Sequence, residues 1–102
     1  MILKAYTVFD VAAGVYDRPF FAHSDKVALR SFADIAVNKD HPIGQHPEDY
    51  SLFAIGEYDD NTGVIKGRDR ECLATALEMV SQAQRVDSEK VAELELKVGG
   101  TE

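Results

Sequence analysis

Apolar and β-branched side chains cluster in the first part of the chain and predict two β-strands. Residues 2–10 contain several β-branched and aromatic side chains and few strong helix formers, which favours an extended strand. Gly14 can adopt the positive φ of a tight turn, and residues 15–22 then predict a second strand. Because Pro19 has no backbone N–H group, we expect this second strand to lie at a sheet edge or to contain a bulge.

The middle of the chain has the clearest strand pattern. Residues 50–58 place apolar side chains on both faces of an extended segment, which indicates a central strand. Strict alternation would put five of them on one face, namely Tyr50, Leu52, Ala54, Gly56 and Tyr58. Residues 59–63 are typical of a turn, and residues 64–68 predict the returning strand of a hairpin.

Apolar residues at three- and four-residue steps predict two amphipathic helices. The first covers about residues 25–37, and the Ser24 hydroxyl is suited to cap its free amides. Asp69 is the expected N-cap of the second helix, with a buried stripe of Leu73, Ala76, Leu77, Val80 and Ala83. Cys72 would lie in the first turn of that helix, and we expect it to be a buried structural thiol.

The remaining segments complete the predicted architecture. Residues 38–49 contain two His-Pro pairs, which predict a loop. In residues 87–102 the alternation of apolar and charged side chains favours a strand, but the composition also fits a helix. The order β-β-α-β-β-α predicts one α+β domain over residues 1–86: a two-layer antiparallel sheet of two hairpins with helices on one face. Residues 87–102 form a C-terminal extension, as a strand or a helix, that can enter an oligomer contact.

Composition limits the class of protein. The 102 residues are 45% hydrophobic and 28% charged, as in an ordinary globular domain. Eighteen acidic residues against 11 basic ones give a net charge of −7, which argues against simple polycationic binding to nucleic acid or anionic lipid. The single cysteine excludes an internal disulfide and a multi-cysteine metal site. No apolar run approaches the roughly 20 residues of a membrane span, so we expect neither a membrane partner nor a signal peptide.

No group of residues matches a motif for catalysis or metal binding. His41 and His46 share a loop with Glu48 and Asp49, but their spacing fits no zinc motif. The acidic residues at 57–60 flank a predicted hairpin tip, where turn formation explains them. We therefore expect neither an enzyme nor a bound cofactor or metal.

Basic and aromatic residues suggest a nucleic-acid interface. Lys66, Arg68 and Arg70 are two residues apart, so a regular strand would project them from one side as a basic stripe. Aromatic rings beside such a stripe can stack on bases, at about 1–3 kcal/mol for each base. The candidate binding residues are Lys4, Tyr6, Arg18, Tyr58, Lys66, Arg68 and Arg70. The alternative is that the rings build the core and the cations are simply solvated.

Two stretches of the chain resemble a known family. One consists of DRPFFA at residues 17–22 and ALRSFAD at 28–34, and the other is HPEDYSLFAIGEYDDNTG at 46–63. With residues 6–10 and 13–15, they resemble the small nonstructural protein of gokushoviruses, which are single-stranded DNA bacteriophages of the Microviridae. The resemblance covers about residues 1–85 and does not include the tail.

This resemblance implies a non-capsid phage protein in the cytoplasm of the bacterial host. The family is associated with DNA binding and viral DNA replication, including the switch to single-strand production and packaging. An accessory protein that binds single-stranded DNA is therefore the first hypothesis. The alternative is an acidic protein-binding module, a dimer or other homo-oligomer, that acts on phage or host replication proteins without touching DNA. Residues 31–60, with one basic and seven acidic side chains, favour that alternative.

Overall fold

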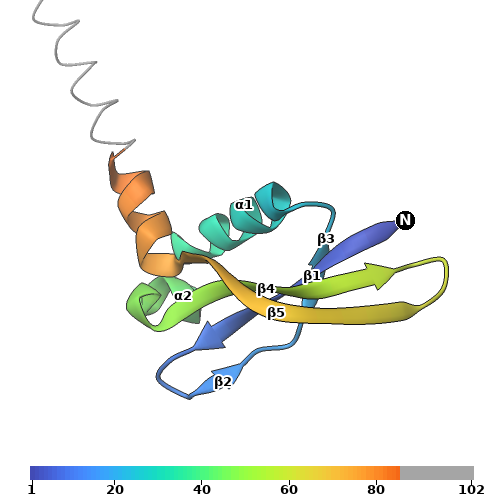
Figure 1. Cartoon of the computed structure of the whole chain (residues 1–102). Helices are drawn as coiled ribbons and strands as arrows, with labels where there is room; N and C mark the ends of the chain where they lie inside the picture. Colours follow the sequence, from blue (N-terminus) through green and yellow to red (C-terminus); the bar gives the residue numbers. More distant parts are fainter. Residues whose placement is uncertain (86–102) are drawn as a thin grey trace, which may run out of the picture.

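Five antiparallel strands form the sheet on which the other elements are arranged (Figure 1). The structure, a computed structural model, describes residues 1–85. Its elements are β1 (Ile2–Asp10), β2 (Val15–Tyr16), β3 (Phe20–Ala22), α1 (Asp25–Ala36), α2 (Pro42–Gln45), the short 3-10 helix η1 (Pro47–Asp49), β4 (Tyr50–Asp59) and β5 (Val64–Thr75). Residues 76–85 are helical. The sheet order is β2-β1-β4-β5, and β3 also pairs with β1, which confirms the predicted α+β class with an antiparallel sheet.

The strand predicted over residues 15–22 is divided into two. Tyr16 in β2 pairs with Phe9 of β1, whereas Phe21 in β3 pairs with Ala5 of the same strand. Pro19 lies in the gap between them, where its missing N–H group is compatible with the loss of ladder pairing.

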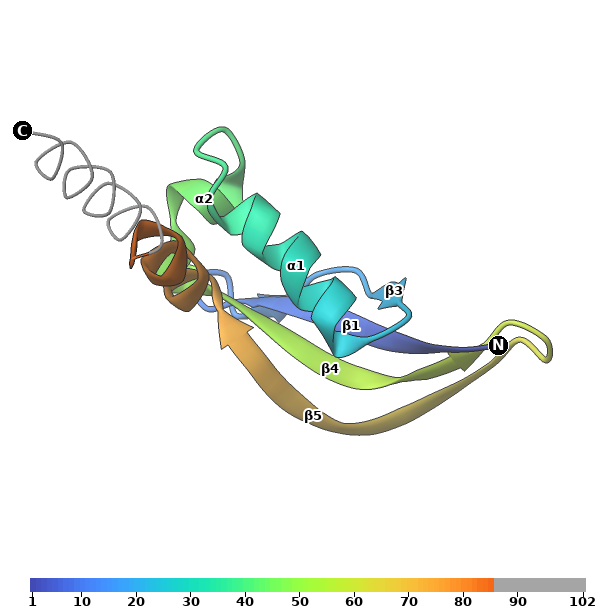
Figure 2. The same cartoon turned by 90° about the horizontal axis from the view of Figure 1, so that it is seen from above.

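Helix α1 has the predicted position and cap. Ser24 accepts a 3.3 Å hydrogen bond from the Val27 amide, so its side chain satisfies one free donor of the first turn. The apolar side of the helix enters the core through Ala28, Phe32 and Ala36. These side chains share the core with Tyr6, Leu52 and Ala54 of the sheet, and Figures 1 and 2 show the helix lying across the strands.

β4 is central, as predicted, but its alternation is interrupted. Ala5 pairs with Gly56 and the next residue, Tyr6, pairs with Ala54, which leaves Ile55 as an extra residue in β4. Such a bulge reverses the side-chain alternation beyond it. The prediction that Tyr58 shares the face of Leu52 and Ala54 is therefore wrong.

β5 continues much further than the sequence pattern indicates. Thr75 and Ala74 still pair with β4, opposite Ser51 and Leu52, and the helix begins only after Thr75. The Thr75 hydroxyl accepts a 3.1 Å hydrogen bond from the Glu78 amide and is thus the actual N-cap. The predictions that Asp69 is the N-cap and that the helix begins at residue 70 are therefore wrong. Pairing of β5 with β4 outweighs the local helix propensity of this segment.

Two further local predictions need correction. Cys72 is an exposed strand residue opposite Phe53, not a buried helical thiol. The segment predicted as a loop contains α2 and η1, each of which begins with a proline. Proline is favourable at the first helical position, because the N–H group that it lacks would have no partner there.

The predicted C-terminal strand or helix at residues 87–102 lies outside the described residues. Within residues 1–85, none of the helices has the length and apolar character needed to cross a membrane.

Candidate nucleic-acid interface

The two faces of the sheet are distinguished by the strand register. Directly paired residues lie on the same face, and successive residues alternate. We call the side on which Tyr6 and Leu52 pack with α1 the helix face. The opposite side, the open face, carries the paired residues Leu3, Ala5, Thr7, Phe9, Tyr16, Phe21, Ser51, Phe53, Tyr58, Ile65, Cys72 and Thr75.

Charge is divided unequally between these faces. The paired carboxylates all lie on the helix face: Asp10, Glu57, Asp59 and Glu71. Among the register-paired residues of the open face, as far as the structure describes the chain, there is no carboxylate. The acidic character of the whole chain therefore does not extend evenly over the sheet.

Three aromatic rings form a cluster on the open face, which we call the first aromatic group. The ring centroids of Phe9 and Tyr16 are 4.5 Å apart, and that of Phe53 lies 6.4 Å from Phe9 and 5.8 Å from Tyr16. Three strands contribute one ring each: β1, β2 and β4. The side chain of Tyr16 remains 43% exposed, so the group is accessible to a flat ligand.

Arg70 brings a positive charge to this group. Its guanidinium carbon lies 5.9 Å from the centroid of the Tyr16 ring, within the range of a cation–π contact. A guanidinium next to exposed rings offers both a phosphate contact and a stacking surface.

Tyr58 contributes to a second aromatic contact on the open face. Its ring centroid lies 5.2 Å from that of Phe21, and the planes are inclined by 41°. Phe21 is 43% exposed. We call these two residues the second aromatic group.

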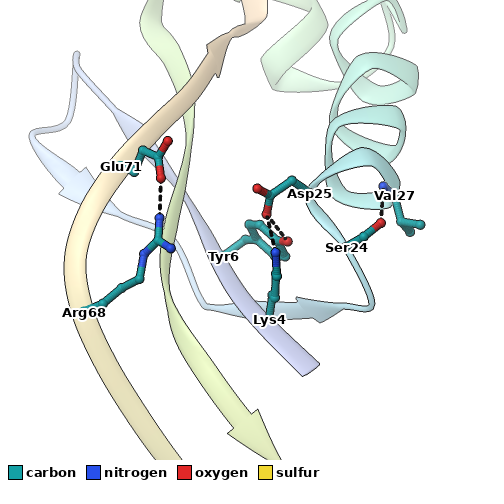
Figure 3. Close-up of polar contacts among 7 residues, drawn as sticks. All are labelled: Lys4, Tyr6, Ser24, Asp25, Val27, Arg68 and Glu71. Carbon is teal, nitrogen blue, oxygen red and sulfur yellow. Dashed lines mark hydrogen bonds and ion pairs between the residues drawn. The ribbon is translucent and has the colours of Figure 1, made fainter. Parts of the chain in front are cut away.

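Lys4 and Tyr6 lie on the other side of the sheet, at the beginning of α1 (Figure 3). The Tyr6 hydroxyl donates a 2.6 Å hydrogen bond to Oδ1 of Asp25, and Lys4 Nζ lies 3.8 Å from the same oxygen. Burial, and then the hydrogen bond to Asp25, raise the pKa of the Tyr6 hydroxyl. Because Tyr6 is completely buried, its ring presents no free face to a base.

The basic stripe expected along β5 is divided by a bulge. Glu71 pairs with Ala54 and Gly67 with Gly56, so three residues of β5 lie opposite the single residue Ile55. Arg68 forms an ion pair with Glu71 (Figure 3), while Arg70 reaches Tyr16 on the open face.

Lys66 and Arg18 are separate from the first aromatic group. Lys66 is opposite Glu57 and lines a hollow of about 270 Å³ on the helix face with Ile2, Asp59, Thr62 and Val64. Arg18 is exposed in the connection between β2 and β3. Of the seven candidate residues, the structure thus brings only Arg70 and Tyr58 to the open-face aromatic groups.

The sequence interpretation did not include Phe9 or Phe53 among the candidate residues. The strand alternation could have identified them, because Phe9 follows Val8 and Phe53 follows Leu52, and both of these preceding residues pack in the core. An aromatic residue at such a position points to the opposite face of the sheet.

The histidine loop has a mainly structural role. His41 Nδ1 accepts a 3.1 Å hydrogen bond from the Ile43 amide and caps α2. His46, Glu48 and Asp49 place ligand atoms within 4.8 Å of one another, with His46 Nδ1 3.7 Å from Glu48 Oε1. Such a cluster on the surface is common without a metal, and nothing else in its surroundings indicates one.

Comparison with known proteins matches most of the chain to a described family. A family model described as Phage ORF5 protein matches residues 3–79, which include β1 to β5 and the first residues of the final helical segment. No curated protein and no solved structure gives a significant match.

Proposed function

Because the chain belongs to the family described as Phage ORF5 protein, and is thus a bacteriophage protein, we propose that it is an accessory protein that binds single-stranded DNA. The observation that carries this proposal is the first aromatic group with Arg70, on a sheet face without a paired carboxylate. The resemblance to the gokushovirus nonstructural protein supports a role in genome replication or packaging in the host cytoplasm.

Single-stranded nucleic acid suits such a surface because its bases are free to stack. Stacking of a base on an aromatic side chain contributes about 1–3 kcal/mol and does not depend on sequence. Tyr16 is exposed and Arg70 lies over its ring, so one base and one neighbouring phosphate can be bound together. In duplex DNA the bases stack on one another, and the same rings have no free partner.

The net charge of −7 does not prevent this interaction, but it limits its strength. The strand carboxylates that have a register partner are on the helix face, so the bound phosphates need not approach these four groups. Long-range repulsion from the whole protein remains, and salt screens it over about 10 Å at 0.1 M. We therefore expect weak, sequence-independent binding with a shallow salt dependence.

Fluorescence anisotropy with a labelled oligothymidylate at low and high salt tests the proposal. Tyr16→Ala removes one stacking surface and should weaken binding by about tenfold. Arg70→Gln should also weaken binding. Arg30→Gln is the matched control, because it removes the same charge from an exposed position on α1.

Unchanged anisotropy of the wild-type protein at tens of micromolar in low salt would exclude the proposal. Equal losses of affinity in Arg70→Gln and Arg30→Gln would show that only net charge matters and would exclude the first aromatic group as the binding site.

A second candidate function, an acidic protein-binding module that forms a dimer, is favoured by the edge position of β5. Among residues 1–85, this 12-residue strand pairs with β4 and with no second strand, and its residues 64–72 are exposed. Unpaired backbone groups at a sheet edge can add a strand from another chain. Light scattering tests it: a mass of two chains, unaffected by added oligonucleotide, would favour this function, whereas a single-chain mass would exclude the dimer.

A further inference from the structure

The second aromatic group is a separate accessible surface on the same face as the first. Phe21 comes from β3 and Tyr58 from β4, and the two rings meet across β1. Phe21 pairs with Ala5, and Tyr58 pairs with Leu3. Ile65, paired with Tyr58 and 65% exposed, extends the apolar surface to β5.

The strand β1 connects the two aromatic groups. Tyr58 is opposite Leu3 and Phe53 is opposite Thr7, so the groups are four residues apart along β1. At about 3.3 Å per residue this is a distance of roughly 13 Å. A stacked nucleic-acid strand advances about 3.4 Å per nucleotide, so roughly four nucleotides cover the distance.

The β1 residues between the centres of the two groups are covered by their neighbours. Ala5 and Thr7, the β1 residues between them on the open face, are only 3% exposed each. The Thr7 hydroxyl is already used, because it donates a 2.7 Å hydrogen bond to the Asp17 carbonyl. A ligand that bridges the groups therefore passes over the groups that cover Ala5 and Thr7, and none of the register-paired residues of this face is a carboxylate.

We propose that one DNA single strand spans both aromatic groups, stacking one base on the Phe9–Tyr16–Phe53 group and another on the Phe21–Tyr58 group. This proposal rests on the proposed function and adds a second subsite to it. Arg70 lies at the first group, so the phosphate nearest to Tyr16 is held by charge, while binding at the second group is by stacking and apolar contact alone.

The dependence of affinity on oligonucleotide length distinguishes a protein with one subsite from a protein with two. Anisotropy or competition measures the affinity for oligothymidylates of two and eight nucleotides, since only the longer one covers the roughly four-nucleotide distance. Phe21→Leu keeps an apolar cover over Ala5 but removes the aromatic face. It should weaken binding of the eight-nucleotide strand by about tenfold and leave binding of the dinucleotide unchanged.

The control is Val27→Ala, which removes apolar surface from a residue of α1 that is 47% exposed. It should leave binding of both oligonucleotides unchanged. Amide spectra of the wild-type protein provide a measurement that does not depend on a variant. The Ala5 and Tyr58 signals should shift with the eight-nucleotide strand and not with the dinucleotide.

The outcomes distinguish the two proposals. Binding with equal affinity in Phe21→Leu and wild type, and without shifts at Ala5 and Tyr58, would overturn the second subsite and leave the proposed function standing. No binding of any single strand would overturn both. Shifts at Tyr58 that appear on self-association without DNA would assign this surface to a second copy of the chain and overturn the subsite.

Discussion

The Tyr6 hydroxyl donates a 2.6 Å hydrogen bond to Oδ1 of Asp25, joining the middle of β1 to the first turn of α1 (Figure 3). The donor belongs to a completely buried side chain, and the acceptor lies where the helix dipole favours a negative charge. Lys4 Nζ, 3.8 Å from the same oxygen, adds a second favourable charge contact. This contact fixes the helix on its face of the sheet and leaves the opposite face available for a ligand.

Tyr6→Phe should lower the free energy of unfolding by about 1–2 kcal/mol, because a part-buried hydrogen bond to a charged group is lost. Urea denaturation followed by circular dichroism measures the change. An unchanged midpoint would contradict a structural role for the contact. Tyr58→Phe, in which the lost hydroxyl belongs to a side chain of the open face, is the matched control and should be nearly neutral.

Stability should also fall at alkaline pH, and Tyr6 should cause part of that fall. Burial and the hydrogen bond to Asp25 raise the pKa of Tyr6 in the folded state. The unfolded tyrosine loses its proton near pH 10, while the folded one keeps it, so the folded state binds more protons above that pH. The stabilisation is therefore complete below about pH 10 and declines by up to about 1.4 kcal/mol per pH unit above it. Denaturation of wild type and Tyr6→Phe between neutral pH and pH above 10 should show the steeper decline in the wild type.

Gly56 and Gly67 should respond oppositely to alanine, although they are paired with each other. A Cβ at Gly56 would lie 2.2 Å from the Lys66 carbonyl oxygen, whereas one at Gly67 would meet no atom within 4 Å. Gly56→Ala should therefore destabilise the protein by about 2–3 kcal/mol, since backbone must move to admit the methyl group. Gly67→Ala should change stability by less than about 0.5 kcal/mol. Thermal denaturation compares them, and similar midpoints would refute the close strand approach at Gly56.

Thr75→Ala should destabilise the protein by about 1 kcal/mol, because the Glu78 amide loses its capping partner. Asp69→Ala serves as the control, since Asp69 is an exposed residue within β5 and caps no helix. The urea denaturation midpoints of the two variants show whether the helix begins at residue 76 or directly after Asp69. A larger loss in Asp69→Ala would contradict the observed boundary.

The salt dependence of DNA binding should separate Arg70 from Arg68. Arg70 lies over Tyr16 on the open face, and Arg68 is paired with Glu71 on the other face. Arg70→Gln should reduce the slope of log affinity against log salt concentration by about one unit. Arg68→Gln should leave the slope unchanged. The same reduction of the slope in both variants would indicate that the DNA single strand binds along the whole of β5.

Local sequence was sufficient to predict several elements closely. Residues 2–10, the Ser24-capped helix and the central strand from residue 50 occur as predicted, because side-chain periodicity and helix capping act over a few residues. The hairpin turn is equally local: Gly63 has φ +75°, a conformation that glycine adopts without strain.

Pairing between distant segments decided the rest. Strand alternation has a period of two, so a single extra residue, such as Ile55, moves every following side chain to the other face. The bulges therefore place Tyr58 with Phe21 and divide Arg68 from Arg70, which no local pattern can specify. Pairing with β4 also extends β5 to Thr75, past a segment whose composition favours a helix. Local side-chain patterns thus specify which residues form β1, α1 and β4, whereas the tertiary pairing of the strands specifies which of their rings and charges share a face.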